Sequence, residues 1–142
     1  MKIAKEFHWE MGHRLPFHKG KCINLHGHSY KAIVEVEGTP DKNGLVIDFY
    51  DLKNIVNPII EKMDHAFMVY EKDKALIKTL KTIKTKKIMV PFQSTVENIC
   101  RYLLEETGDA LDSFSNIYSV TVTVYETPDS YARDTYFGRL PN

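Results

Sequence analysis

The sequence has few of the features that mark secreted, membrane-bound or nucleic-acid-binding proteins. Its 142 residues include only two cysteines, Cys22 and Cys100, and its nineteen basic and nineteen acidic side chains cancel to no net charge. No apolar run reaches the roughly 18 residues that a membrane span needs, and the first residues lack the apolar core of a signal peptide. We therefore expect a cytoplasmic protein with free thiols that binds neither a membrane nor nucleic acid.

Repeats, low-complexity tracts and linker-like segments are also missing, so we expect residues 1–142 to form a single domain. A domain of this length buries enough surface to fold without disulfides or a structural metal. Any metal site in it is therefore more typical of function than of structural support.

Alternation of apolar and polar side chains predicts several strands. The pattern is moderate over Ile3–Trp9, and it is clear over His26–Glu37 and Ile117–Thr127. Turn-forming residues fill positions 38–44. We expect the segment after them, Leu45–Phe49, to be a strand that pairs with or extends beyond the second strand.

Apolar residues at helical spacing predict an amphipathic helix over Leu52–Met63, with Pro58 as a point where it can kink. A second helix is predicted from Ser94 to about Gly108, because residues 94–97 have the form of a capping box. The coarse order of strand, strand, helix, helix, strand, strand indicates an α+β layer fold.

The segment Asp73–Val90 is rich in lysine and has no clear period, and we expect a short solvated helix followed by a strand there. A solvated face is the simpler interpretation of its charge, and contact with a triphosphate is the alternative. The lysines of this segment and its border are Lys72, Lys74, Lys78, Lys81, Lys84, Lys86 and Lys87.

Three histidines are candidate metal ligands. His26 and His28 lie one residue apart on a predicted strand, so both imidazoles point to the same face. His13 lies just after the first predicted strand and comes beside them if the first two strands pair. Three imidazoles would hold Zn²⁺ and leave its fourth position open, as catalytic sites do. The same spacing also occurs among ordinary surface or core histidines, so it leaves both interpretations open.

The two cysteines differ in their surroundings. Cys22 lies four residues before His26, close enough to share a pocket with it. As a thiolate it can act as a base, as a fourth zinc ligand it would close a structural site, and as a buried thiol it would only pack. Cys100 falls within the apolar stripe of the second predicted helix, where we expect it to be part of the core.

Two acidic positions are candidates for contact with a ligand. Asp64 precedes His65 at the end of the first helix, and a carboxylate that contacts a histidine fixes its tautomer. Glu126 ends the inward-facing row of a strand, where a carboxylate must reach the surface or meet a buried donor. Paired N–H groups of a ligand would suit it. A polar helix end and a plain strand-end glutamate are the alternatives.

Together these residues occur in an order that resembles the 6-pyruvoyl-tetrahydropterin synthase superfamily, from about Phe7 to Tyr136. The matching segments are His13-Arg14-Leu15, Cys22 to His28, Gly44 to Phe49, Asp64-His65, Thr95 to Asn98 and Glu126-Thr127. The short gap between Cys22 and His26 is similar to the 6-carboxy-5,6,7,8-tetrahydropterin synthase branch, which supplies precursor for queuosine and other deazapurines. Ser94 stands where the family pattern has proline, and Met68-Val69 where it has Leu-Asn.

The resemblance implies a tunnelling-type fold, or T-fold, of order ββααββ with an antiparallel sheet backed by two helices. Three subunits would close their sheets into a barrel, and two trimers would stack as a homohexamer with active sites between subunits. The implied reaction converts 7,8-dihydroneopterin triphosphate to 6-carboxy-5,6,7,8-tetrahydropterin, acetaldehyde and triphosphate. Formation of 6-pyruvoyl-tetrahydropterin on the same fold is one alternative, and a non-catalytic zinc-binding module is another.

The resemblance also implies roles for single residues. Zn²⁺ would be held as a Lewis acid by His13, His26 and His28. Cys22 would abstract a side-chain proton as a thiolate, and Asp64 with His65 would exchange protons on the opposite side of the substrate.

Substrate binding is implied for three further residues. Glu126 would bind the amino-pyrimidine edge of the pterin. Thr95 and Glu97 would also contact substrate, with helix capping as the simpler role for Glu97.

Overall fold

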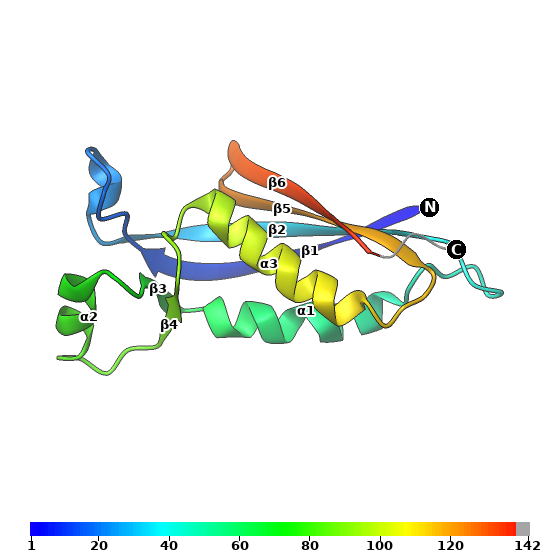
Figure 1. Ribbon diagram of the computed structural model, residues 1–142, viewed down its shortest axis with the longest axis horizontal. Coiled ribbons are helices and arrows are strands. Elements are labelled where there is room, and N and C mark those ends of the chain that lie inside the picture. The colour runs from blue at the N-terminus through cyan, green and yellow to red at the C-terminus, as the bar shows by residue number, and fades with distance from the viewer. Residues whose placement is uncertain (139–142) are drawn as a thin grey trace.

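The computed structural model describes residues 1–138, so residues 139–142 of the predicted single domain lie outside the described part. A six-stranded sheet in the order β4-β3-β1-β2-β5-β6 packs against helices α1 and α3 (Figure 1). The elements are β1 (Lys2–His13), a 3₁₀ turn η1 (Lys21–Ile23), β2 (His26–Gly38), α1 (Phe49–Met63), β3 (Ala66–Tyr70), α2 (Lys74–Leu80), β4 (Lys87–Val90), α3 (Val96–Leu111), β5 (Ile117–Thr127) and β6 (Ser130–Phe137).

The centre of the sheet is antiparallel, with β1 paired to β2, β2 to β5, and β5 to β6. The predicted strands over His26–Glu37 and Ile117–Thr127 are confirmed. The first strand is longer than its alternation indicated and ends at His13, which therefore lies within β1 and not after it. In the register of the hairpin His13 stands opposite His26.

The strand expected over Leu45–Phe49 is wrong. Val46 and Ile47 are buried, but they attach a loop to the core and pair with no strand of residues 1–138. Asp48 then caps α1, since its carboxylate accepts a hydrogen bond from the backbone N–H of Tyr50 at 2.8 Å. A short apolar run thus indicated burial correctly and secondary structure incorrectly.

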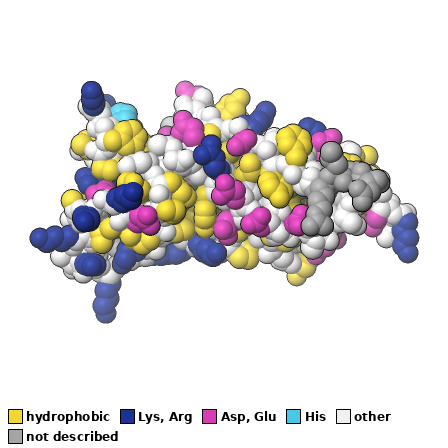
Figure 2. All heavy atoms as spheres, viewed as in Figure 1, with side chains coloured by type: hydrophobic (Ala, Val, Ile, Leu, Met, Phe, Trp, Pro, Cys, Tyr) yellow, Lys and Arg dark blue, Asp and Glu magenta, His cyan; other side chains and the backbone are white. Residues whose placement is uncertain are grey.

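The sheet is mixed, whereas the resemblance implied an antiparallel one. Strand β3, which the coarse element order missed, pairs in parallel with β1 at Met11 and Gly12. Strand β4 pairs in parallel with β3. The expected short helix followed by a strand is confirmed by α2 and β4, and the lysines of this region project from one end of the molecule (Figure 2).

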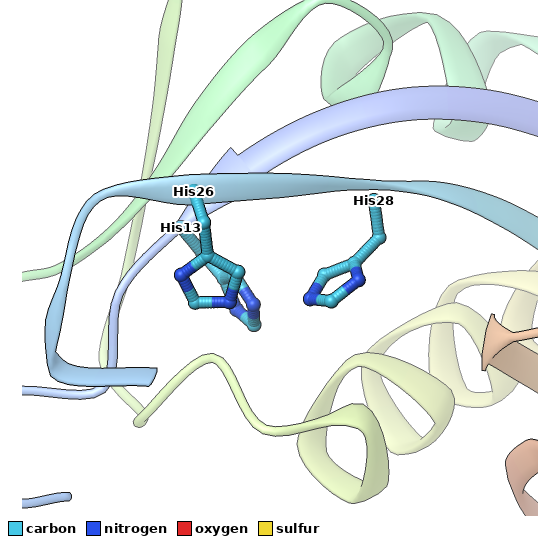
Figure 3. Close-up of side chains that lie close together, drawn as sticks. All are labelled: His13, His26 and His28. Carbon is cyan, nitrogen blue, oxygen red and sulfur yellow. The ribbon is translucent and has the colours of Figure 1, made fainter. Parts of the chain in front are cut away.

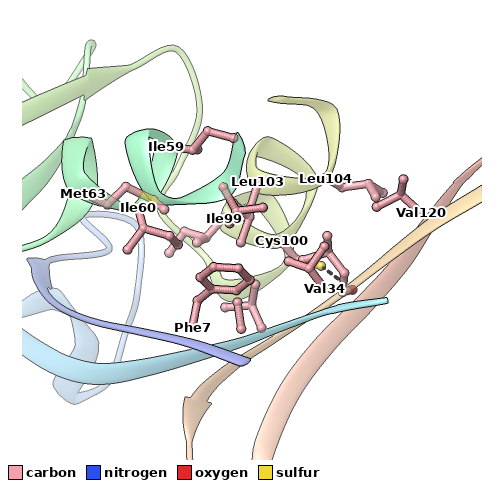
Figure 4. Packing of buried hydrophobic residues seen from close by; sticks show 14 of the residues in the cluster. Phe7, Val34, Ile59, Ile60, Met63, Ile99, Cys100, Leu103, Leu104 and Val120 are labelled. Carbon is pink, nitrogen blue, oxygen red and sulfur yellow. Dashed lines mark hydrogen bonds between the residues drawn. The ribbon is translucent and has the colours of Figure 1, made fainter. Parts of the chain in front are cut away.

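The main core lies between the sheet and the two long helices (Figure 4). Helix α1 continues through Pro58 and buries one face, and α3 buries the face that carries Cys100. The prediction that Cys100 is part of the core is confirmed, because its side chain is 1% exposed and its thiol donates to the carbonyl of Val122.

The capping residue of α3 differs from the predicted one. Thr95, not Ser94, is the N-cap, and its hydroxyl accepts a hydrogen bond from the N–H of Asn98 at 3.3 Å. Glu97 consequently lies one position too early to complete a capping box. It is exposed in the first turn, where its negative charge interacts favourably with the positive end of the helix dipole.

Alternate residues of β1 and β2 separate two faces of the sheet. Phe7, Trp9 and Tyr30 point to the helices and are buried, whereas Glu6, His8 and Ser29 occupy the alternating positions and are exposed. One face is therefore covered by helices and the other is not. Among residues 1–138, no helix combines the length and apolar character that crossing a bilayer requires.

Candidate metal centre and active site

The three predicted metal ligands converge at the end of the β1–β2 hairpin (Figure 3). Pairing of β1 with β2 sets His13 opposite His26, and His28 lies two residues further along the same face. One ring nitrogen from each histidine lies within 4.8 Å of the other two. The ring centroids are 4.6 Å apart for His13 and His26 and 4.9 Å apart for His26 and His28.

Backbone carbonyls set the tautomers of two of these rings. Nδ1 of His13 lies 2.7 Å from the carbonyl oxygen of Ser94, and Nδ1 of His26 lies 2.7 Å from that of Asn24. A carbonyl oxygen only accepts, so each Nδ1 carries the proton and each Nε2 presents a lone pair. The Nε2 atoms of all three histidines are buried without a hydrogen-bond partner among the described residues. Three convergent, unpartnered imidazole nitrogens fit Zn²⁺.

Burial favours the uncharged form of His13 and of His28. It lowers the pKa of His13 from 6.5 to about 4, and the neighbouring His26 and His28 lower it further, against the hydrogen bond to Ser94. The pKa of His28 is also lowered by burial, which outweighs the opposing charge of Glu126. A metal binds the neutral form of imidazole, so no proton has to be displaced from His13 at neutral pH.

Glu126 lies beside the histidines, where the end of β5 meets the end of the hairpin. Its Oε1 is 3.6 Å from Nε2 of His13 and 3.7 Å from Nε2 of His28. The carboxylate therefore lies against the histidine cluster and is not only a strand end, and its side chain stays 24% exposed. Burial, followed by the charge of Glu126, raises the pKa of Tyr30, whose hydroxyl is buried without a hydrogen-bond partner among residues 1–138.

Cys22 lies on η1, in the loop that joins β1 to β2 at the same end of the molecule. The backbone N–H of Leu15 donates to the carbonyl of Cys22 at 2.8 Å, which closes this loop on itself. The thiol is free and partly exposed. Among residues 1–138 the group of mutually close metal-binding atoms contains the three histidines and not Cys22, so this geometry does not favour a closed Cys-His₃ site.

The chain folds Asp64 and His65 together. Oδ1 of Asp64 is 3.0 Å from Nδ1 of His65 and accepts a hydrogen bond from the backbone N–H of Glu10 at 2.9 Å. That hydrogen bond, followed by His65 and Lys86, lowers the pKa of Asp64. His65 has a φ of 56°, in the left-handed region that side chains other than glycine rarely adopt. Such a conformation is typical of functional sites.

Within one chain the Asp64–His65 pair is not part of the group of mutually close metal-binding atoms that the three histidines form. His65 lines an open cleft of about 370 Å³ together with Gly12, Gly27, Ser29 and one of the candidate ligands, His28. Gly12, Gly27 and Ser29 alternate with the metal-ligand candidates along the hairpin, and alternate strand residues face opposite sides of a sheet. The cleft therefore opens mainly on the uncovered face, whereas the imidazoles of the three histidines point to the covered face.

The remaining predicted residues lie at the start of α3. Thr95 serves as the cap of the helix and Glu97 is exposed, so helix formation already accounts for both. Sequence reasoning missed the carbonyls of Ser94 and Asn24, because a backbone acceptor leaves no mark on side-chain identity. It also missed Tyr30, which a buried row predicts only as core.

The family model described as 6-pyruvoyl tetrahydropterin synthase matches residues 2–135. A 6-carboxy-5,6,7,8-tetrahydropterin synthase of Haemophilus influenzae is 39% identical over 138 residues, covering 92% of this chain and 95% of that protein. The protein of the same name from Rickettsia conorii is 30% identical, covering 92% and 97%.

Solved structures share the fold. A 6-pyruvoyltetrahydropterin synthase mutant of Plasmodium vivax superposes with a TM-score of 0.80 at 21% identity, covering 96% of this chain and 98% of that one. An uncharacterised protein of Wolinella succinogenes gives a TM-score of 0.78 at 26% identity, covering 94% and 97%. The predicted T-fold is confirmed by this agreement over nearly the whole chain.

Proposed function

Because this chain belongs to the 6-pyruvoyl tetrahydropterin synthase family, we propose that it is a zinc-dependent lyase acting on 7,8-dihydroneopterin triphosphate. The proposed products are 6-carboxy-5,6,7,8-tetrahydropterin, acetaldehyde and triphosphate. The names of the relatives from Haemophilus influenzae and Rickettsia conorii support the 6-carboxy product.

One observation carries the proposal: the unpartnered Nε2 atoms of His13, His26 and His28 converge beside a carboxylate. Zn²⁺ bound there would supply a Lewis acid that stabilises negative charge developing on the oxygens of the substrate side chain. The fixed Nδ1–H groups of His13 and His26 hold their rings in the orientation that such binding needs.

The protein's own side chains would perform the proton transfers and the binding. Cys22, on its loop at the same end of the sheet, would remove a proton from the substrate side chain as a thiolate. Asp64 and His65 would exchange protons with the other side of the substrate, with the carboxylate fixing the imidazole. Glu126 would accept two hydrogen bonds from the amino-pyrimidine edge.

The separation of Asp64–His65 from the histidines leads us to infer that each site joins two subunits of a homohexamer built from two trimers. Among residues 1–138, the edge of β1 from Lys2 to His8 that faces away from β2 pairs with no strand, and β6 ends the sheet on the other side. Two free edges of this kind favour closure of several sheets into a barrel. In such a barrel the pair of one subunit would meet the histidines of another.

A product assay tests the activity. Zinc-loaded protein is incubated with 7,8-dihydroneopterin triphosphate, and the products are identified by mass. We expect 6-carboxytetrahydropterin together with acetaldehyde. Release of triphosphate without acetaldehyde would assign the chain to 6-pyruvoyl-tetrahydropterin formation instead, and unchanged substrate would refute the lyase proposal.

Substitution of the two cysteines separates catalysis from metal binding. We expect Cys22→Ala to keep the zinc content of the wild-type protein and to lose at least about 10²-fold in kcat, the scale of a lost general base. Cys100→Ala removes the other thiol and should retain turnover. Loss of zinc from the Cys22→Ala protein would instead identify Cys22 as a ligand.

A further inference from the structure

We propose that Lys86 is a positioning residue that holds the Asp64–His65 turn in its reactive geometry, an inference that rests on the proposed function. Lys86 belongs to the lysine-rich segment, to which the metal centre and the family resemblance assign no role. Two hydrogen bonds place its ammonium group at the base of the turn, and a third fixes its backbone.

The backbone of Lys86 is fixed by the sheet. Its carbonyl accepts a hydrogen bond from the N–H of Phe67 at 3.0 Å, next to the pairing of β3 with β4. Its side chain reaches back toward the end of α1, where the ammonium donates to the carbonyl oxygens of Glu61 and, at 2.7 Å, Asp64. Carbonyls in the last turn of a helix have no N–H partner within the helix, so they are free to accept from Lys86. The negative end of the helix dipole also stabilises a cation at this place.

The peptide group between Asp64 and His65 is consequently held from both sides. Its oxygen accepts from Lys86, and its N–H donates to the carbonyl of Glu10 at 2.6 Å. Rotation of this peptide plane would change the φ of His65, which is 56°. Because that conformation is unfavourable for a histidine, both contacts are needed to keep the imidazole against the Asp64 carboxylate.

Lys86 differs from the other lysines of its segment. Among residues 72–87, it is the only lysine whose ammonium group forms a hydrogen bond within the described part of the chain. Its neighbour Thr85 lines the same cleft as His65, so this end of the segment reaches the proposed proton-transfer residues. Lys84 is exposed and makes no such contact, which makes it a matched control.

Three variants test the proposal in the zinc-loaded protein: Lys86→Met, Lys86→Arg and Lys84→Met. We expect Lys86→Met to lower kcat by about tenfold to hundredfold, the scale of a misplacement near 1 Å, with KM within about twofold of wild type. Lys86→Arg should recover most of the loss, because a guanidinium also donates to carbonyls. Lys84→Met should match wild type. A wild-type kcat in Lys86→Met, or a loss confined to KM, would overturn the proposal.

A readout without substrate separates this proposal from the proposed function. Amide hydrogen exchange at His65 reports the hydrogen bond to Glu10, and we expect it to be faster in Lys86→Met while exchange in the middle of β2 stays unchanged. This result is expected even if the wild-type protein leaves dihydroneopterin triphosphate intact, in which case only the lyase proposal fails. Unchanged exchange at His65 would refute the positioning role directly.

Discussion

At the scale of single residues, the candidate site depends on histidines whose charge and orientation are set before any ligand arrives. Burial holds the pKa of His13 at about 4, and carbonyls of Ser94 and Asn24 fix the protons of two rings on Nδ1. Both effects direct neutral Nε2 lone pairs toward one point. The folded protein therefore orients these nitrogen atoms for a cation before the cation binds.

The low pKa of His13 predicts how the metal-free protein responds to acid. An unfolded chain protonates this histidine below about pH 6.5, whereas the folded chain resists protonation until about pH 4. The contribution of His13 to the free energy of unfolding is therefore fully present above pH 6.5. It is lost as the pH drops toward 4, which lowers the free energy of unfolding by about 3 kcal/mol for this group alone.

Urea unfolding of metal-free protein at a series of pH values measures this loss. His13→Asn should show a smaller fall between pH 7 and 4.5, whereas His8→Asn, on the exposed face, should retain the wild-type slope. Equal slopes in the wild-type and His13→Asn proteins would show that His13 titrates normally in the folded state.

At the scale of secondary-structure elements, the start of α3 positions Ser94, whose carbonyl contacts His13, so it matters for the candidate metal centre. We expect Thr95→Ala to lower the free energy of unfolding by about 1 kcal/mol, because the N–H of Asn98 loses its capping oxygen. Thr95→Ser should retain most of the wild-type stability, because serine keeps the capping hydroxyl. Chemical denaturation compares the three proteins, and a loss in Thr95→Ser as large as in Thr95→Ala would contradict the capping role.

The same helix gives a test of the substrate-binding prediction for Thr95 and Glu97. If capping is the whole role of Thr95, Thr95→Ala lowers stability without changing KM. The exposed Glu97 should tolerate change to Gln with a stability loss below about 1 kcal/mol. If both substitutions raised KM, Thr95 and Glu97 would both be assigned to substrate binding.

The local sequence pattern predicted those strands and helices that have one apolar and one polar face. It did not predict the elements whose two faces are alike. The pattern is strong in β2, β5 and α1, because one side of each meets the core and the other side carries mostly polar residues. Strand β3 is short and mostly buried, so it shows no alternation, and it follows the irregular backbone of His65. Val46 and Ile47 looked like a strand because burial, not pairing, selects apolar side chains.

The site could be predicted only in part, for a related reason. The spacing of His26 and His28 is local and predicted their shared face, while His13 needed the pairing of β1 with β2. The location of Asp64 and His65 on the other side of the sheet depends on the parallel contact of β3 with β1, which joins segments far apart in the sequence. No local pattern reports such a contact.

At the scale of the whole molecule, one chain holds the parts of the proposed site on opposite faces of its sheet. Mixing two inactive proteins tests whether subunits complete each other's sites. His26→Ala removes a proposed metal ligand, and His65→Ala removes the proposed proton-transfer imidazole. We expect each variant alone to be inactive. Subunit exchange between them should restore measurable turnover, because some interfaces then combine the intact histidine cluster of one variant with the intact Asp64–His65 pair of the other.

Recovery in the mixture requires that subunits exchange, which a tagged wild-type chain verifies by co-purification. If exchange occurs and the mixture stays inactive, the complete site lies within one chain. The quaternary structure then has to be explained by the free edges of β1 and β6 alone.

The facing positions of His13 and His26 have one more consequence. An ion held between them would act as a crosslink across the mouth of the loop that runs from Arg14 to Leu25, joining its two stems. Chelation would release that link and allow the stems to fray, and Cys22 would move with them. A chelated sample should thus gain thiol reactivity and susceptibility to proteases in this loop before the rest of the fold loosens.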